Sequence, residues 1–193
     1  MKIAAIFGSP NTRGSSSELH EIFLSASERA GITVMRIHAY QSNIMPCTDC
    51  GICRTENRCI HDDDMNEVYE HIRSADALTI SSPVYFSSLP GPLKNLIDRC
   101  QLFWEARKRN PNPPRKRPAY FLATAGSLYP QVFSPSLTII RHFYNSLDFV
   151  FNEKDFFLLA GLDKLGTVPK ESREKLVLAG NDFAQTIMNV FEK

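Results

Sequence analysis

The chain has 193 residues, of which 43% are hydrophobic and 22% are charged, and its formal net charge is +1. This size and composition are typical of one globular domain, so we expect residues 1–193 to form a single domain. The near-zero net charge excludes a global electrostatic attraction to nucleic acid or to a membrane surface, and no apolar run approaches the length of a membrane span.

Short apolar runs alternate along the chain with longer amphipathic segments. The apolar runs predict strands over residues 2–8, 32–39, 75–82, 119–126 and 148–161, with an irregularity near residues 152–155. The amphipathic segments predict helices over residues 15–31, 62–75, 90–106, 134–147 and 172–193. Because parallel strands need crossover helices, this order predicts an α/β fold in which helices cover both faces of a five-stranded parallel sheet.

The loop GSPNTRGSSSEL follows the first predicted strand. Gly8 permits close approach of the backbone, and the hydroxyls of Ser9, Ser15 and Ser16 lie at a helix N-terminus, where an anion is favoured. The loop has neither the lysine of a Walker motif nor the spacing of a dinucleotide fingerprint. It therefore suits a phosphate group, although a serine-rich helix cap would have the same composition.

Two further loops follow later strands. In SSPVYFSSLPGPLKNLIDR, Tyr85 and Phe86 lie where a flat ligand could cover them, or where a hydrophobic turn could pack on its neighbours. In ATAGSLYP, small residues around Gly126 leave room beside a strand end. Ligands bind beyond the carboxyl ends of strands in open α/β sheets, so the three loops together predict a phosphate pocket beside a slot for a flat ring.

Four of the five cysteines lie in a cysteine-rich loop over residues 45–61, with the spacing C-x2-C-x2-C-x5-C. Such crowded thiols do not suit a secreted disulfide framework, and the first apolar run is too short for a signal peptide, so we expect a cytoplasmic protein. The thiols could hold a [4Fe-4S] cluster, act as redox reagents, or bind zinc. Cys100 fits a buried helix position, and His61 and the three aspartates that follow it fit a helix start. The four clustered cysteines are Cys47, Cys50, Cys53 and Cys59.

A basic segment, residues 105–118, surrounds a proline-rich turn. A solvated loop is one interpretation, and contact with an NADPH phosphate or an acidic electron carrier is another. Nucleic-acid binding is not expected because the segment lacks a helix that could enter a groove. The cations are Arg107, Lys108, Arg109, Arg115, Lys116 and Arg117.

The loops described above, together with CTDCGICRTENRCIHDDDM, resemble those of the flavodoxin-like NAD(P)H-dependent FMN reductases, including the iron-sulfur flavoprotein subset, over nearly the whole chain. The resemblance implies a three-layer α/β/α flavodoxin-like fold with strand order 2-1-3-4-5, and a homodimer or homotetramer. It implies no catalytic side chain, because the flavin carries the chemistry. The FMN-binding residues that it implies are Ser9, Asn11, Ser15, Ser16, Pro83, Val84, Tyr85, Phe86, Thr124, Ala125, Gly126 and Ser127.

The function implied by this resemblance is an FMN-dependent oxidoreductase that takes electrons from NAD(P)H and passes them to a quinone, a flavin or another small acceptor. The alternative is an iron-sulfur flavoprotein in which Cys47, Cys50, Cys53 and Cys59 hold a [4Fe-4S] cluster. Single electrons would then pass between FMN, the cluster and a ferredoxin-like protein carrier. A flavodoxin-like binding module with structural zinc is the third alternative.

Overall fold

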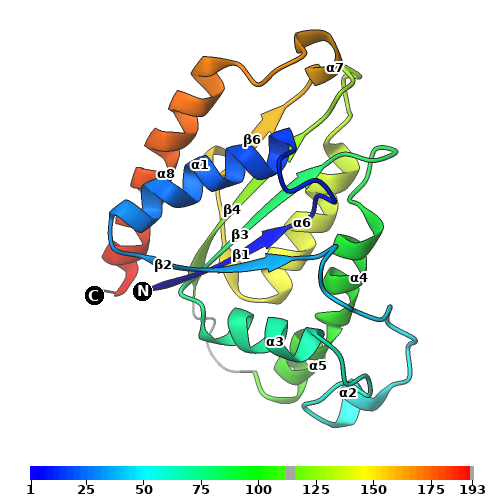
Figure 1. Cartoon of the computed structure of the whole chain (residues 1–193). Coiled ribbons are helices and arrows are strands. Elements are labelled where there is room, and N and C mark those ends of the chain that lie inside the picture. Colours follow the sequence, from blue (N-terminus) through cyan, green and yellow to red (C-terminus); the bar gives the residue numbers. More distant parts are fainter. Residues whose placement is uncertain (112–115, 192–193) are drawn as a thin grey trace.

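The computed structural model describes residues 1–111 and 116–191 and has three layers, with helices on both faces of a parallel sheet (Figure 1). The sheet has the order β2-β1-β3-β4-β5, and β6 also pairs with β4. The flavodoxin-like strand order is therefore confirmed. The strands are β1 (Lys2–Phe7), β2 (Thr33–His38), β3 (Ala77–Pro83), β4 (Arg117–Thr124), β5 (Phe149–Val150) and β6 (Phe156–Leu159). The helices are α1 (Ser15–Arg29), α2 (Ile52–Thr55), α3 (Met65–Ser74), α4 (Gly91–Arg99), α5 (Gln101–Arg109), α6 (Ser134–Ser146), α7 (Leu162–Leu165) and α8 (Lys170–Phe191), with a 3-10 turn η1 (Glu153–Asp155).

The interior strand β1 shows why the sheet needs helices on both faces. Ile3, Ala5 and Phe7 pack into the core under α1 and α8, whereas Ala4 and Ile6 pack against α3, α4 and α6. All five side chains are buried. A continuous apolar run is thus stable as a strand only between two helical layers, and β1 lies in the interior of the sheet between β2 and β3.

Of two further expectations about the elements, the structure confirms one and contradicts the other. The expected irregularity in the fifth strand is confirmed, because η1 separates β5 from β6 and Asp155 caps it by accepting a hydrogen bond from the Asn152 amide. The single helix expected over residues 90–106 is wrong. It breaks at Cys100, whose amide bonds to Ile97 in a tighter turn, and α5 then runs beside α2. Among the described residues, no helix is long and apolar enough to cross a bilayer.

A buried histidine joins α1 to β3. The two ring nitrogens of His20 lie 2.9 Å from Ser81 Oγ and 2.8 Å from Thr79 Oγ1, and the ring is fully buried beside Phe7. Burial, with the charges of Arg36 and His38, lowers the pKa of His20 to about 3. The folded protein therefore keeps this ring neutral, whereas the unfolded chain takes up a proton near pH 6.5.

We expect the His20 ring to make stability depend on pH. Below pH 6.5 the unfolded state binds one more proton than the folded state, so the free energy of unfolding falls by about 1.4 kcal/mol per pH unit. Urea titrations should show that the free energy of unfolding is about 2 kcal/mol lower at pH 5 than at pH 7 because of this residue. His20→Gln should abolish this part of the pH dependence. His142→Gln, at an exposed position on α6, is the matched control and should keep it. Identical pH dependence in wild type and His20→Gln would contradict the assignment.

Candidate functional site

The loops after β1, β3 and β4 meet at one edge of the sheet (Figure 1). The Gly8 amide donates to Ser81 O at 2.8 Å, and the Val84 amide donates to Thr124 O at 2.8 Å. Because these strands are parallel neighbours, their carboxyl ends lie side by side. The three segments selected from the sequence are therefore brought together.

The loop after β1 leads into the N-terminus of α1. The helix begins at Ser15 with Gly14 as its N-cap, and no side chain caps it, so the serine-rich cap that the sequence also allows is not formed. The hydroxyls of Ser9 and Ser17 instead donate to Asn11 O at 3.1 and 2.9 Å, which closes the loop on itself. The first-turn amides consequently remain for an external acceptor.

Gly8 sets the approach of this loop to β3. A Cβ atom at this position would lie 2.5 Å from Leu93 Cδ2 and 3.0 Å from Ser81 O. A larger residue would have to push the Leu93 side chain aside and would lie tightly against the backbone of β3. The loop after β1 is thus held against the neighbouring strand, as the sequence predicts for a position of close backbone approach.

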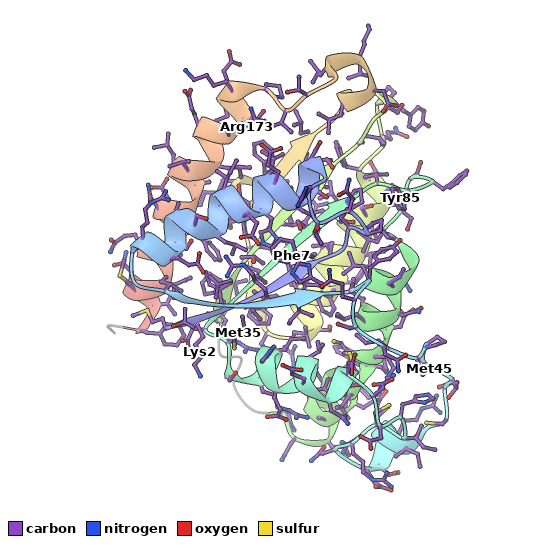
Figure 2. All side chains as sticks on the ribbon, in the orientation of Figure 1. Lys2, Phe7, Met35, Met45, Tyr85 and Arg173 are labelled. Atoms are coloured by element: carbon purple, nitrogen blue, oxygen red, sulfur yellow. The ribbon has the colours of Figure 1, made fainter. Side chains whose placement is uncertain are left out.

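The loop after β3 carries exposed aromatic side chains. Tyr85 and Ser88 exchange two backbone hydrogen bonds of 3.0 Å across a tight turn, in which Phe86 and Ser87 have φ angles of 48° and 59°. Phe86 is fully exposed, and Tyr85 lies at the outer edge of the molecule (Figure 2). A bulky residue at positive φ with no packing partner is costly, so a functional reason is expected for this turn.

Tyr40 is an aromatic neighbour of this turn that the sequence did not single out. It follows β2 and is 39% exposed. Burial and the nearby Tyr85 raise the pKa of Tyr40. Tyr40 and Tyr85 follow β2 and β3, which lie on either side of β1, and no local pattern in the sequence marks Tyr40.

The loop after β4 is supported by a segment that the sequence analysis also missed. The carbonyl oxygens of Ala125, Gly126 and Ser127 accept hydrogen bonds from the amides of the segment that opens α7, at 3.1 to 3.2 Å. The Ala125 amide donates to Leu159 O at 2.9 Å, so the loop is tied to β6 as well. The donors from the α7 segment are Leu162, Asp163 and Gly161 respectively.

These features fit a ligand with a phosphate and a flat ring. The uncapped start of α1 offers amide donors to an anion, and Ser9 and Ser16, both more than 90% buried, lie beside it. The exposed Tyr85 and Phe86 offer aromatic faces, and the backbone of residues 124–127 offers a fixed wall. FMN has both parts, and the residues present fit it.

The four clustered cysteines line one small cavity of about 80 Å³. All four are free thiols; Cys47 and Cys50 are exposed, and Cys53 and Cys59 are half-buried. Gly51 has a φ of 78°, a left-handed conformation that glycine adopts without strain, and it turns the chain between the second and third thiols. Across residues 1–111 and 116–191, no three His, Cys, Asp or Glu side chains are arranged to hold a single metal ion. The thiols thus surround a cavity without converging on one point.

The pKa of Cys53 bears on whether this thiol is a redox reagent or a metal ligand. Burial raises the pKa of the Cys53 thiol, and electrostatic interactions with Cys47, Glu105 and Cys50 raise it further. A thiol with a raised pKa is a poor nucleophile, so Cys53 does not suit a redox reagent. Coordination to a metal, by contrast, removes the proton from a thiol.

A buried ion pair closes the base of the cysteine-rich loop. Arg99 and Asp63 join at 2.8 and 3.1 Å, with side chains 1% and 4% exposed. Both also hold the start of the loop, because Arg99 donates to Met45 O at 2.8 Å and Asp63 accepts from the Met45 amide at 3.0 Å (Met45 is labelled in Figure 2). Burial alone would raise the pKa of Asp63, but the hydrogen bonds from Arg99, Met45 and Met65 lower it below its ordinary value.

The aspartates before α3 therefore do more than the helix start expected from the sequence. Asp63 accepts from the Met65 amide at 3.1 Å, as a residue at a helix start does, but its main partner is Arg99. Asp64 is the N-cap, yet its carboxylate accepts from the Asn43 amide at 2.7 Å rather than capping α3. These carboxylates hold the two ends of the loop together.

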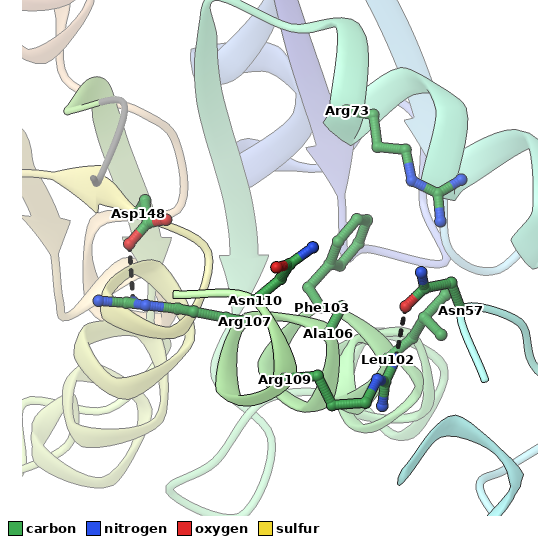
Figure 3. A pocket seen from close by; sticks show the side chains of 9 residues that line it. All are labelled: Asn57, Arg73, Leu102, Phe103, Ala106, Arg107, Arg109, Asn110 and Asp148. Carbon is green, nitrogen blue, oxygen red and sulfur yellow. Dashed lines mark hydrogen bonds and ion pairs between the residues drawn. The ribbon is translucent and has the colours of Figure 1, made fainter. Parts of the chain in front are cut away.

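The basic segment over residues 105–118 is mainly structural where it is described. A cavity of about 780 Å³ lies beside α5. Among the side chains that line it, Arg107 pairs with Asp148 at 2.7 Å and Arg109 bonds to Asn57 (Figure 3). Arg109 also donates to Cys53 O and Glu56 O, so it fastens α5 to the cysteine-rich loop. These cations have partners within the fold, which disfavours a purely solvated loop.

The expectation that Arg117 belongs to an exposed basic loop is wrong. It is the first residue of β4 and is 8% exposed, and its guanidinium donates to Ile72 O, Ala75 O and Leu147 O at 2.8 to 3.0 Å. The strand begins at Arg117, two residues before the apolar run over residues 119–126. A buried arginine is tolerated there because backbone carbonyls satisfy its guanidinium. Arg115 lies outside the described residues.

Comparison with known proteins adds a family match. Residues 1–133 match the family described as NADPH-dependent FMN reductase. An iron-sulfur flavoprotein of Methanosarcina thermophila is 34% identical over 110 residues, which are 57% of this chain and 56% of that protein. An iron-sulfur flavoprotein of Archaeoglobus fulgidus is 34% identical over 99 residues, which are 51% of this chain and 45% of that protein. The chain thus spans about half the length of these curated relatives.

A solved structure agrees on the fold. The FMN-dependent NADH-azoreductase from Bacillus anthracis, solved in complex with FMN, superposes with a TM-score of 0.70 over 97% of this chain and 99% of its own. Its sequence identity is 16%, so it supports the flavodoxin-like architecture alone.

Proposed function

Because the chain belongs to the NADPH-dependent FMN reductase family, we propose that it is an FMN-dependent oxidoreductase of the iron-sulfur flavoprotein type. In this proposal it forms a single FMN-binding domain with a cysteine-rich loop at residues 45–61. Electrons pass between FMN and a [4Fe-4S] cluster that is held by Cys47, Cys50, Cys53 and Cys59.

One observation carries the proposal: four free thiols line a single cavity beneath an anchored loop. A cluster needs four thiolates around a small object rather than around one ion, and these thiols enclose a cavity without meeting at a point. The names of the curated relatives support the same choice, since those printed for the Methanosarcina and Archaeoglobus proteins are iron-sulfur flavoproteins. Structural zinc fits less well, because four ligands would have to converge on one ion.

The flavin site is assigned by the same reasoning. The α1 amides with Ser9, Asn11, Ser15 and Ser16 bind the phosphate, the segment from Pro83 to Phe86 contacts the ribityl chain and ring, and Thr124 to Ser127 line the ring. When bound, FMN accepts a hydride and releases electrons singly or in pairs, so no side-chain acid or base is needed. The residues of this chain bind and orient the flavin and keep its ring against the backbone of the β4 loop.

Removing phosphate donors should weaken FMN binding. The double change Ser9→Ala and Ser16→Ala removes one hydroxyl that closes the loop and one on the first turn of α1. The Ser9 hydroxyl donates to Asn11 O, so Ser16 is the direct donor that the double change removes. A hydrogen bond to a charged group contributes about 1.5–3 kcal/mol, so the Kd for FMN should rise about tenfold or more. Fluorescence titration of the apoprotein with FMN measures this change.

Ser25→Ala is the matched control, since Ser25 is half-buried on the same helix but more than two turns from its N-terminus. Its FMN affinity should equal that of the wild type. Unchanged affinity in the double variant would refute the phosphate assignment.

The experiment that tests the function is iron, sulfide, zinc and flavin analysis, with a visible spectrum, on protein purified without oxygen. FMN with about four irons and four sulfides per chain is expected. FMN without metal would contradict the cluster and support a simple flavin reductase. Zinc without iron would support the alternative in which the cysteines hold structural zinc.

Direct turnover of a reduced nicotinamide is the second candidate, supported by the family match. In this candidate NAD(P)H reduces FMN, and a quinone, a flavin or another small molecule accepts the electrons. Steady-state NAD(P)H oxidation with such acceptors separates it from one-electron exchange with a ferredoxin-like carrier. Cys47 and Cys50 are exposed, so a cluster held by the four cysteines would be accessible to a carrier. A homodimer or homotetramer is also proposed, from the family resemblance.

A further inference from the structure

Two shielded nitrogen atoms beside the cysteines lack hydrogen-bond partners. Arg99 Nε and His61 Nε2 are both buried and unpartnered within the described part of the chain. Both residues line the same cavity as the four cysteines. A buried donor without an acceptor costs free energy, so each such group in a native structure needs an explanation. An acceptor inside the cavity would supply one.

Arg99 is fixed in place by its other contacts. Its two terminal nitrogens are used by Asp63 and Met45, its carbonyl accepts from Tyr69 OH at 2.9 Å, and its side chain is 1% exposed. The remaining donor, Nε–H, therefore cannot turn toward water. Cys59 is close enough to interact electrostatically with the guanidinium. A positive group thus faces the thiols from a rigid support.

We propose that Arg99 Nε–H and His61 Nε2–H donate hydrogen bonds to sulfur atoms of the cluster and thereby raise its midpoint potential; this inference rests on the proposed function. Hydrogen bonds to the sulfurs are among the factors that set the potential of such clusters. They strengthen as the sulfurs become more negative, so they stabilise the reduced form. The buried cation acts in the same direction because screening is weak in this environment. For His61 the role requires the ring proton on Nε2.

In this role Arg99 and His61 adjust the midpoint potential of the cluster through hydrogen bonds, and neither residue is a ligand of the iron. Arg99 cannot bind a metal while it is a cation. The four cysteines complete the ligand set of a [4Fe-4S] cluster, so His61 is not needed for coordination. Their effect therefore falls on the potential and not on the iron content.

The test is an anaerobic redox titration of the purified protein, followed in the visible and electron paramagnetic resonance spectra, for wild type, Arg99→Lys and His61→Phe. Arg99→Lys keeps a positive charge opposite Asp63 but removes the Nε–H donor, and His61→Phe keeps a ring of similar shape without nitrogen. The cluster midpoint is expected to become more negative in each variant, whereas the FMN midpoint stays unchanged.

Identical cluster midpoints in wild type and both variants, with full iron content, would overturn the inference and leave the proposed function intact. Wild-type protein without iron would overturn the proposed function and this inference together. If Arg99→Lys does not fold, His61→Phe decides, because that side chain is only half-buried and forms no part of the Asp63 ion pair.

Discussion

Cys50→Ala is expected to reduce the iron and sulfide content of the protein from about four per chain to near zero. A [4Fe-4S] cluster needs four thiolate ligands, and this change removes one from the exposed side of the cavity, where water can enter. FMN should remain bound, because none of the proposed FMN-binding residues lines the cysteine cavity. Iron analysis and the flavin absorbance of the purified variant measure both results.

Cys100→Ala is the matched control. Cys100 is buried at the junction of α4 and α5 and does not line the cysteine cavity, so its loss should leave the iron content unchanged. The loop should keep its anchors in Cys50→Ala, because the Asp63–Arg99 pair and the Arg109 contacts do not involve sulfur. Full iron in Cys50→Ala would show that the ligand assignment is wrong.

The sheet could be predicted from the sequence because its signals are local. Buried parallel strands are continuous apolar runs, as in β1 and β3, and helices between them are amphipathic, so element order implied the layers. The break at Cys100 was not predictable, since residues 90–106 keep a helical pattern across it and the turn is set by how α5 packs beside α2. Periodicity describes which face of a segment is buried, but not where tertiary packing bends it.

The same limit applies to the candidate site. The three loops at the strand ends were predictable because serine, glycine and aromatic residues mark them directly. Tyr40 and the α7 segment were not, because they reach the site through strands that become neighbours only in the fold. The Asp63–Arg99 pair spans 36 residues, and neither residue differs in its local sequence from a helix-start aspartate or a surface arginine.

Asp63→Asn is expected to lower the free energy of unfolding by about 3–5 kcal/mol, because it leaves a buried guanidinium without its counter-charge. Arg99 is 1% exposed at the pair, so water cannot replace the lost carboxylate. The change also weakens the acceptor of the Met45 amide, which holds the start of the cysteine-rich loop. Urea unfolding followed by the fluorescence of Trp104 measures the loss.

Asp62→Asn separates this effect from a general loss of negative charge before α3. Asp62 is exposed and accepts a hydrogen bond from the Asn66 side chain, so Asp62→Asn should change the free energy of unfolding by no more than about 0.5 kcal/mol.

The pH dependence of stability is a second check on the Asp63–Arg99 pair. Since the fold lowers the pKa of Asp63, its contribution is present above the ordinary value of 3.8 and is lost as pH falls through the lowered value. The stability difference between wild type and Asp63→Asn should therefore shrink below pH 4, and a difference that stays constant down to pH 2 would mean that the carboxylate charge is not what holds Arg99.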